Sequence, residues 1–243
     1  MRNKRYKIGD YMGKTNLLEC RKETEYFKFF CVENDELCLE KLSEILEYNY
    51  KKILYDLNLT LEKKVEVRIY PDMKTFHKNI VGNIDSPDWL VGITQHGIIH
   101  IVSPLNPGPA HKYDSILKIA VHEFIHILVK KINSQGVWRF LDEGLALFGA
   151  EQLEDRHKDI LVSAVLSKKI PTINELESDF VEQNGFVFAY TIIEFIIKRY
   201  GFAKLNELIR NPSDFRKIFN TTEDEFEEEW IKFLNKHYKV YMS

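Results

Sequence analysis

The sequence has few of the residues that characterise disulfide-rich, turn-rich or membrane-spanning proteins. Only three of its 243 residues are cysteines, and this sparse, odd-numbered set argues against a disulfide framework. The 11 glycines and 7 prolines are too few for a turn-rich all-β protein. No stretch reaches about 18 uninterrupted apolar residues, so we expect no membrane-spanning helix.

The charge balance excludes a further class. The chain has 34 basic and 37 acidic side chains and a formal net charge of −3, so we expect no nucleic-acid partner. The first 20 residues are basic but lack the apolar core of a secretory signal, which favours a cytoplasmic protein. Hydrophobic residues make up 44% of the chain, enough for one large globular domain or two smaller halves.

Strand patterns occur only in the first half of the chain, and helical patterns dominate from residue 114 onward. We therefore predict an α+β fold with an amino-terminal subdomain (1–132) built on a mixed sheet with helices, and a carboxy-terminal helical subdomain (133–243). His77 is expected at the surface. The predicted strands are 24–32, 65–70, 89–94 and 97–103, and the predicted helices are 36–57, 72–80, 114–131, 138–151, 157–168, 184–200, 202–210 and 222–240.

The pentapeptide His-Glu-Phe-Ile-His at 122–126 is the strongest chemical signal. On a helix, positions four apart lie on one face, so His122 and His126 can bind one zinc ion while Glu123 acts on a water molecule. The surrounding segment 116–129 is apolar apart from Lys118. Two histidines and a glutamate in such a helix are costly to bury unless they are paired or bound to a metal.

Catalytic zinc sites use a third protein ligand and leave one position open. Asp142 and Glu143 lie near the start of the next predicted helix, after a break that includes Gly136. Either carboxylate is acceptable to zinc, so ligand chemistry alone leaves both open, with the other stabilising the helix start. Gly144, Ala146 and Gly149 keep this helix slim enough to pack closely on the first.

The segments HEFIH and WRFLDEGLA together resemble the gluzincin metallopeptidases of the thermolysin-like clan, above all the peptidase MA-like families and the catalytic core of aminopeptidase N. The resemblance covers about residues 64–201 and implies one Zn²⁺ held by His122, His126 and Glu143, with Glu123 as general base. Trp138 lies further from the glutamate than in aminopeptidases and the gap between the two motifs is shorter. The aminopeptidase signature Gly-x-Met-Glu-Asn is also absent, so nothing selects a free amino terminus.

The same resemblance implies two further parts of a peptidase site. An edge strand just before the zinc helix would pair with the substrate backbone, which assigns substrate binding to Gly97, Ile98, Ile99 and His100. His100 would either touch the substrate or lie on the outer face of its strand. A tyrosine on the helix that starts near residue 184 would stabilise the oxyanion, which assigns that role to Tyr190.

The sequence thus predicts a thermolysin-like zinc peptidase acting on peptides or proteins, and it carries no signal for the oligomeric state. Two alternatives remain open. The chain can be a peptide-binding or regulatory module that keeps the metal without turnover, although a structural site needs no general base such as Glu123. It can also be a zinc hydrolase of non-peptide amides.

Overall fold

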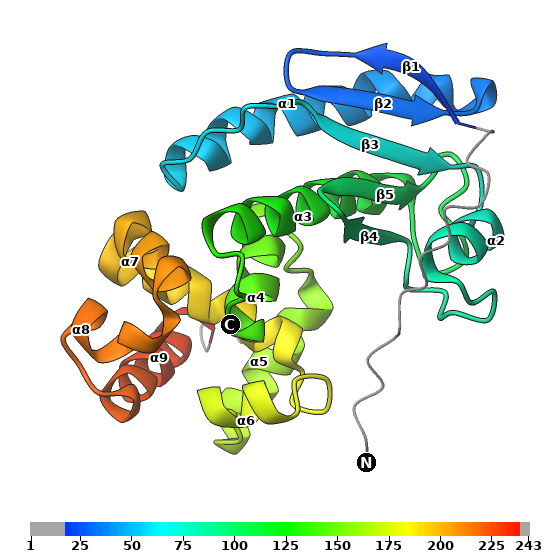
Figure 1. The fold of residues 1–243 in the computed structure, drawn as a ribbon. Coiled ribbons are helices and arrows are strands. Elements are labelled where there is room, and N and C mark those ends of the chain that lie inside the picture. The colour runs from blue at the N-terminus through cyan, green and yellow to red at the C-terminus, as the bar shows by residue number, and fades with distance from the viewer. Residues whose placement is uncertain (1–17, 239–243) are drawn as a thin grey trace. The chain divides into compact units, whose positions relative to one another are not determined.

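A computed structural model describes residues 18–238, and it has the predicted α+β composition (Figure 1). Contacts divide the chain into two compact units. The first contains the described residues up to 52 and residues 61–124, and the second contains residues 53–60 and the described residues from 125 onward. The division falls inside a helix, whereas the sequence places it after residue 132, and those domain boundaries stay a prediction.

The first unit contains a five-stranded mixed sheet. Its strands lie in the order β1-β2-β3-β5-β4, with β2, β3 and β5 parallel to one another and β1 and β4 antiparallel to their neighbours. A mixed sheet was predicted and is confirmed. The strands are β1 (Glu19–Glu23), β2 (Phe27–Cys31), β3 (Val65–Tyr70), β4 (Gly92–Gln95) and β5 (Ile98–Val102).

The strands predicted at 89–94 and 97–103 pair as an antiparallel hairpin, β4 and β5. His96 and Gly97 form its two-residue turn, with φ of 53° and 76°, and Gln95 pairs with Ile98 across it. Two consecutive positive φ angles give the turn that matches the twist of the flanking strands, which favours glycine at the second position. Strand β1 was not predicted, because its sequence Glu-Cys-Arg-Lys-Glu has no apolar alternation.

Alternating side chains give the sheet one apolar face. Phe27 pairs in register with Val65, and Val67 with Ile99, so all four side chains point the same way. All four are buried. The ring of Phe27 contacts Tyr50 and Phe124 at centroid distances of 5.8 and 5.3 Å, so the helices that carry these two rings cover this face. They are α1 (Leu39–Asp56), which follows a 3₁₀ turn (Glu33–Cys38), and α3 (Tyr113–Ile132).

The opposite face is covered in part by a short helical segment. Asp72 caps α2 (Met73–Phe76) by accepting from the backbone N–H of Thr75 at 2.7 Å, and a π-helical turn (His77–Val81) follows. His77 was expected at the surface, and that prediction is wrong. Its side chain is buried, and its Nε2 lies 2.7 Å from the carbonyl oxygen of Leu90, a bond that satisfies the ring nitrogen away from water.

The second unit is helical. Its core includes Phe226, Trp230 and Tyr238 of the last helix, and the indole N–H of Trp230 donates to Thr191 Oγ1 at 3.1 Å. Gly201 has a non-helical φ of 81° and divides α7 where the sequence predicted two helices. Two short helices, α6 and α8, were not predicted. The helices are α4 (Arg139–Gly149), α5 (Asp155–Ser167), α6 (Ile173–Ser178), α7 (Gly185–Arg210), α8 (Phe215–Phe219), preceded by a 3₁₀ turn (Pro212–Asp214), and α9 (Glu223–Tyr238).

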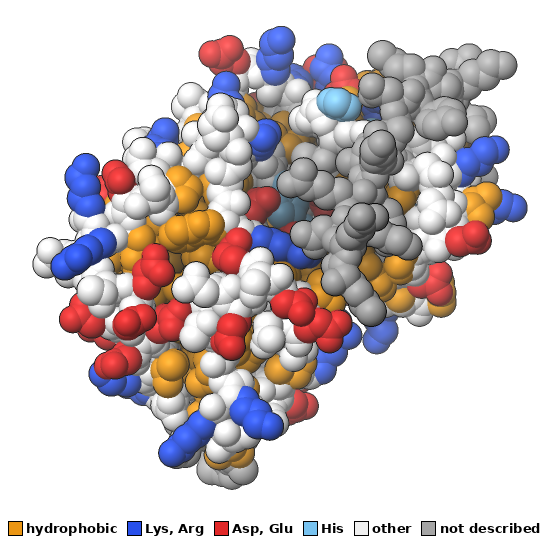
Figure 2. Space-filling model, turned by 60° about the horizontal axis from the view of Figure 1, so that its bottom comes forward, with side chains coloured by type: hydrophobic (Ala, Val, Ile, Leu, Met, Phe, Trp, Pro, Cys, Tyr) orange, Lys and Arg blue, Asp and Glu red, His pale blue; other side chains and the backbone are white. Residues whose placement is uncertain are grey.

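Among residues 18–238, no helix is long and apolar enough to cross a membrane. Figure 2 shows both basic and acidic side chains on one face of the protein. This mixture agrees with the small net charge of the chain.

Candidate metal centre

Helix α3 brings the two motif histidines to one face. It runs without interruption from Tyr113 to Ile132, so His122 and His126 lie one turn apart. Their immediate neighbours Val121, Phe124 and Ile125 are buried and hold the helix in place, while both imidazoles are only half-buried. The imidazoles therefore lie at the boundary between core and solvent, where a metal ion can reach them.

The third group comes from α4. His122, His126 and Glu143 each offer one ligand atom, and these atoms lie within 4.8 Å of one another. Two imidazoles and one carboxylate are a donor set that catalytic zinc sites use. The residues therefore fit a zinc ion by the chemistry of their donors and by their proximity.

Asp142 has a different partner. Its Oδ1 lies 2.8 Å from Nδ1 of His126. When Nδ1 carries the proton and donates it to this carboxylate, Nε2 is left unprotonated for a metal. The sequence left Asp142 open as a rival ligand, whereas here its carboxylate contacts the ring of His126, a candidate ligand. A contact of this kind orients the imidazole and raises its basicity.

Glu123 lies against strand β4. Glu123 is only 7% exposed, and its backbone carbonyl accepts a hydrogen bond from Thr94 Oγ1 at 2.7 Å. A Cβ added to Gly92 would lie 2.4 Å from Ile119 Cγ2 and 3.3 Å from Glu123 Oε1. The β4 backbone thus approaches the Glu123 carboxylate closely, and a larger residue at position 92 would have to displace the Ile119 side chain of α3. Sequence reasoning did not identify Gly92 or Thr94, although an isolated glycine in a strand is a signal of close backbone approach.

The predicted edge strand is not an edge. The prediction that residues 97–104 form one is wrong, because β5 pairs with β3 on one side and β4 on the other. Ile98, Ile99 and His100 are paired with strands on both sides, and Gly97 lies in the hairpin turn. None of the four therefore offers a free strand edge, and their assigned substrate contact loses its basis. Among the strands of residues 18–238, the sheet ends at β1 and β4.

His100 lies on the sheet face opposite α3. It pairs with Arg68, whereas the flanking Ile99 and Ile101 point to the face that α3 covers. Its Nδ1 lies 3.0 Å from the hydroxyl of Tyr70, and the residue is 5% exposed. Burial, together with the charges of Arg68 and His96, lowers the pKa of His100 to about 4. The sequence predicted that His100 either touches the substrate or lies on the outer face of its strand, and in the structure it lies on the outer face.

Tyr190 belongs to α7, which packs closely on α4. A Cβ on Gly144 would lie 2.6 Å from the carbonyl oxygen of Ala189, so the two helix backbones nearly touch beside Glu143. The Tyr190 ring lies 5.4 Å from the ring of Phe148 on α4. Burial, with Glu194 and Glu151 nearby, raises the pKa of Tyr190 to about 12, so its hydroxyl stays protonated at neutral pH.

The glycines of α4 serve two neighbours. A Cβ on Gly149 would meet Ile125 Cδ1 at 2.4 Å, so this glycine permits the expected close packing on α3. Gly144 instead faces α7, which corrects the expectation that it packs on α3. The two glycines therefore place α4 close to a different helix at each point.

The family model described as the Peptidase MA superfamily matches residues 50–239, which is more than half of the chain and includes both motif segments. No curated protein matches the sequence significantly.

Proposed function

This chain belongs to the Peptidase MA superfamily, and from that premise we propose that it is a zinc-dependent peptidase of the thermolysin-like clan. The observation that carries the proposal is the grouping of His122, His126 and Glu143 beside the buried Glu123. A site that only stabilised the fold would need no buried carboxylate next to its ligands, since structural zinc sites are closed by four protein ligands.

Each residue has a defined task in the proposed reaction. His122 and His126, from α3, and Glu143, from α4, would hold zinc, which lowers the pKa of a water molecule and polarises a carbonyl group. Glu123 accepts a proton from the attacking water and returns it to the departing amine. Asp142 keeps His126 in the tautomer that presents Nε2, supported by the 2.8 Å contact.

The tyrosine completes the proposed site. As the tetrahedral intermediate forms, negative charge develops on the former carbonyl oxygen, and a hydrogen-bond donor at that oxygen stabilises it. We assign this donor to Tyr190. The position of Tyr190 on α7, which packs on α4 beside Glu143, supports the role.

Strand β4 is the part of the sheet best suited to a peptide. It pairs with β5 alone among the strands of residues 18–238, and its Gly92 backbone lies against the Glu123 carboxylate. An extended peptide that pairs with β4 through main-chain hydrogen bonds would lie beside the general base. Binding of this kind uses the main chain of the peptide and not its side chains, so it favours extended segments of varied sequence.

The test compares metal content and peptide hydrolysis in three variants. Glu123→Gln should keep zinc and lose hydrolysis of an unstructured protein such as casein, because only the base is removed. Glu143→Ala should lose zinc. Glu44→Gln, on the exposed surface of α1, makes the same charge change as Glu123→Gln and should alter neither property.

The outcomes separate the alternatives. Zinc-loaded wild-type protein that cleaves no peptide library but binds peptides would indicate a module without turnover. Cleavage of small acyl amides in the absence of peptide cleavage would indicate a non-peptide hydrolase. Hydrolysis by Glu123→Gln at the wild-type rate would refute the assignment of the base.

A further inference from the structure

A second candidate binding site lies in the helical unit. It is a partly enclosed cavity of about 170 Å³. A cavity of about 150 Å³ can admit a ligand as large as benzene, so this one has room for a compact organic headgroup. Its lining comes from the start of α4, from α6, from α8 and from the start of α9. The lining residues are Trp138, Ile173, Asn174, Glu177, Phe215 and Glu223.

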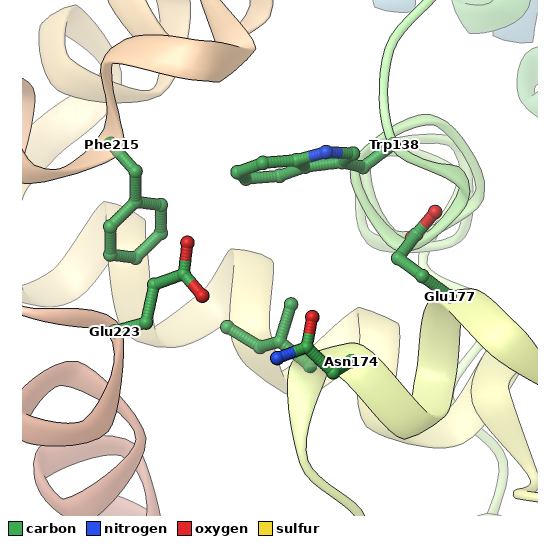
Figure 3. Close-up of a pocket in the computed structure, with 6 residues that line it drawn as sticks. Trp138, Asn174, Glu177, Phe215 and Glu223 are labelled. Carbon is green, nitrogen blue, oxygen red and sulfur yellow. The ribbon is translucent and has the colours of Figure 1, made fainter.

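Two aromatic rings form part of the wall. Figure 3 shows the indole of Trp138 across one side of the cavity and the ring of Phe215 on another. Their centroids are 6.0 Å apart, and Phe215 is buried, so the arrangement is held by packing. The faces of such rings carry partial negative charge and attract cations, tryptophan most strongly.

Two carboxylates and an amide complete the lining. Glu177 is fixed in place, because its two oxygens accept from the backbone N–H groups of Arg139 at 3.1 Å and Phe140 at 2.9 Å. Figure 3 shows the Glu223 carboxylate and the Asn174 amide turned toward the space between them and Trp138. The Asn174 amide oxygen can accept a further hydrogen bond from an N–H donor.

The charge around the cavity is negative. Among the described residues, no basic side chain lines it. The guanidinium of the nearby Arg139 lies instead over the ring of Phe180, 4.4 Å from its centroid. Burial, and to a smaller extent the nearby carboxylates of Asp224 and Glu223, raise the pKa of Glu227 on the same helix as Glu223.

We propose that this cavity binds an organic cation, an ammonium or guanidinium group on a short apolar stem, through the Trp138 face and the carboxylates of Glu177 and Glu223. Aromatic walls accept the stem and the charge together, and the carboxylates select a cation over a neutral or anionic group. The side chains of lysine and arginine, and free small amines, share this chemistry. The site shares no residue with the proposed zinc centre, and its binding of a cation does not require the proposed peptidase activity.

The test is a titration of the full chain with n-butylammonium and n-propylguanidinium, followed through the indole N–H signals of the three tryptophans by NMR. The Trp138 signal, identified with a Trp138→Phe variant, should shift in a saturable manner. The fully buried Trp230 should not shift and serves as the internal control. Butan-1-ol and inorganic phosphate supply the neutral and anionic comparisons. Nα-acetyl-lysine amide distinguishes a peptide side chain from a free amine, since only a site open to peptides accepts it.

Glu223→Gln should weaken binding about fivefold, the upper range for an exposed ion pair. Glu228→Gln changes the same charge on a solvent-exposed part of α9 and should leave binding unchanged. Raising the salt concentration should weaken binding of the cations, because exposed charge pairs are screened. Equal binding of butan-1-ol, binding of phosphate in place of the cations, or absence of a Trp138 shift would each overturn the proposal.

Discussion

Gly144→Ala should destabilise the protein, because the added methyl group has no room. An ideal Cβ at this position lies 2.6 Å from the carbonyl oxygen and 2.8 Å from the carbonyl carbon of Ala189, and 2.8 Å from Ile193 Cγ1. The first two are backbone atoms of α7 and cannot rotate away. The clash of the added methyl group can therefore be removed only if α4 and α7 move apart, which loosens the contact between these helices beside Glu143.

The magnitude follows from two opposing terms. Overpacking a core costs about 1–3 kcal/mol, and the upper half of that range applies when the obstacle is backbone. Replacing glycine by alanine inside a helix returns about 1 kcal/mol through helix propensity. The net expectation is a loss of about 1–2 kcal/mol in the free energy of unfolding. For a chain of this size, that loss corresponds to a Tm lowered by about 2–8 °C.

Gly149→Ala is the matched control on the same helix. Its Cβ would meet Ile125 Cδ1 at 2.4 Å, but that atom is the end of a flexible side chain that can turn aside. We expect its free energy of unfolding to stay within about 0.5 kcal/mol of wild type. Urea unfolding followed by circular dichroism measures both variants. Equal stability of the two variants would show that α7 yields at Ala189 and would refute the reasoning.

Three further expectations concern single side chains. Asp142→Ala should weaken zinc binding about 10–100-fold in a chelator competition, because His126 loses the carboxylate that orients it; unchanged affinity would leave the contact without a role. His100 binds protons more weakly in the folded protein, with its pKa lowered from 6.5 to about 4. The free energy of unfolding should therefore fall by up to about 3 kcal/mol as the pH drops from 6.5 to about 4. Urea unfolding at a series of pH values measures this fall, and it should be smaller in His100→Gln. An equal dependence on pH in the wild type and the variant would contradict the burial argument. Tyr190→Phe should reduce peptide turnover about 100-fold with zinc content intact, and a wild-type rate would exclude the hydroxyl from the reaction.

Sequence patterns predicted the elements whose periodicity is unambiguous. Strand β3 alternates apolar and polar residues and has the predicted bounds of residues 65–70. Helix α3 carries His122 and His126 on one continuous apolar helix, within a residue of the predicted bounds at each end. In both cases the local pattern and the tertiary environment require the same structure, so the sequence alone suffices.

The neighbours of each element could not be predicted in the same way. The pattern of β5 indicates a buried strand, but nothing along its own length tells whether a second strand pairs with it, and β4 does so. Similarly, Asp142 and Glu143 are adjacent carboxylates about 100° apart around α4. Which of them contacts His126 and which joins the ligand group depends on how α4 is rotated, and packing of Gly144 against α7 contributes to that rotation.

The short length of β4 has a consequence for self-association. A strand at the end of a sheet can template pairing with another copy of the chain, and long flat edges promote aggregation. Strand β4 spans only Gly92–Gln95 and ends in the tight turn at His96 and Gly97. Four residues can hold a short segment of extended chain beside Glu123, but they give a second copy too little edge for a continuous intermolecular sheet. Because the strand is short, it favours transient binding of an extended peptide over stable pairing with a second copy of the chain.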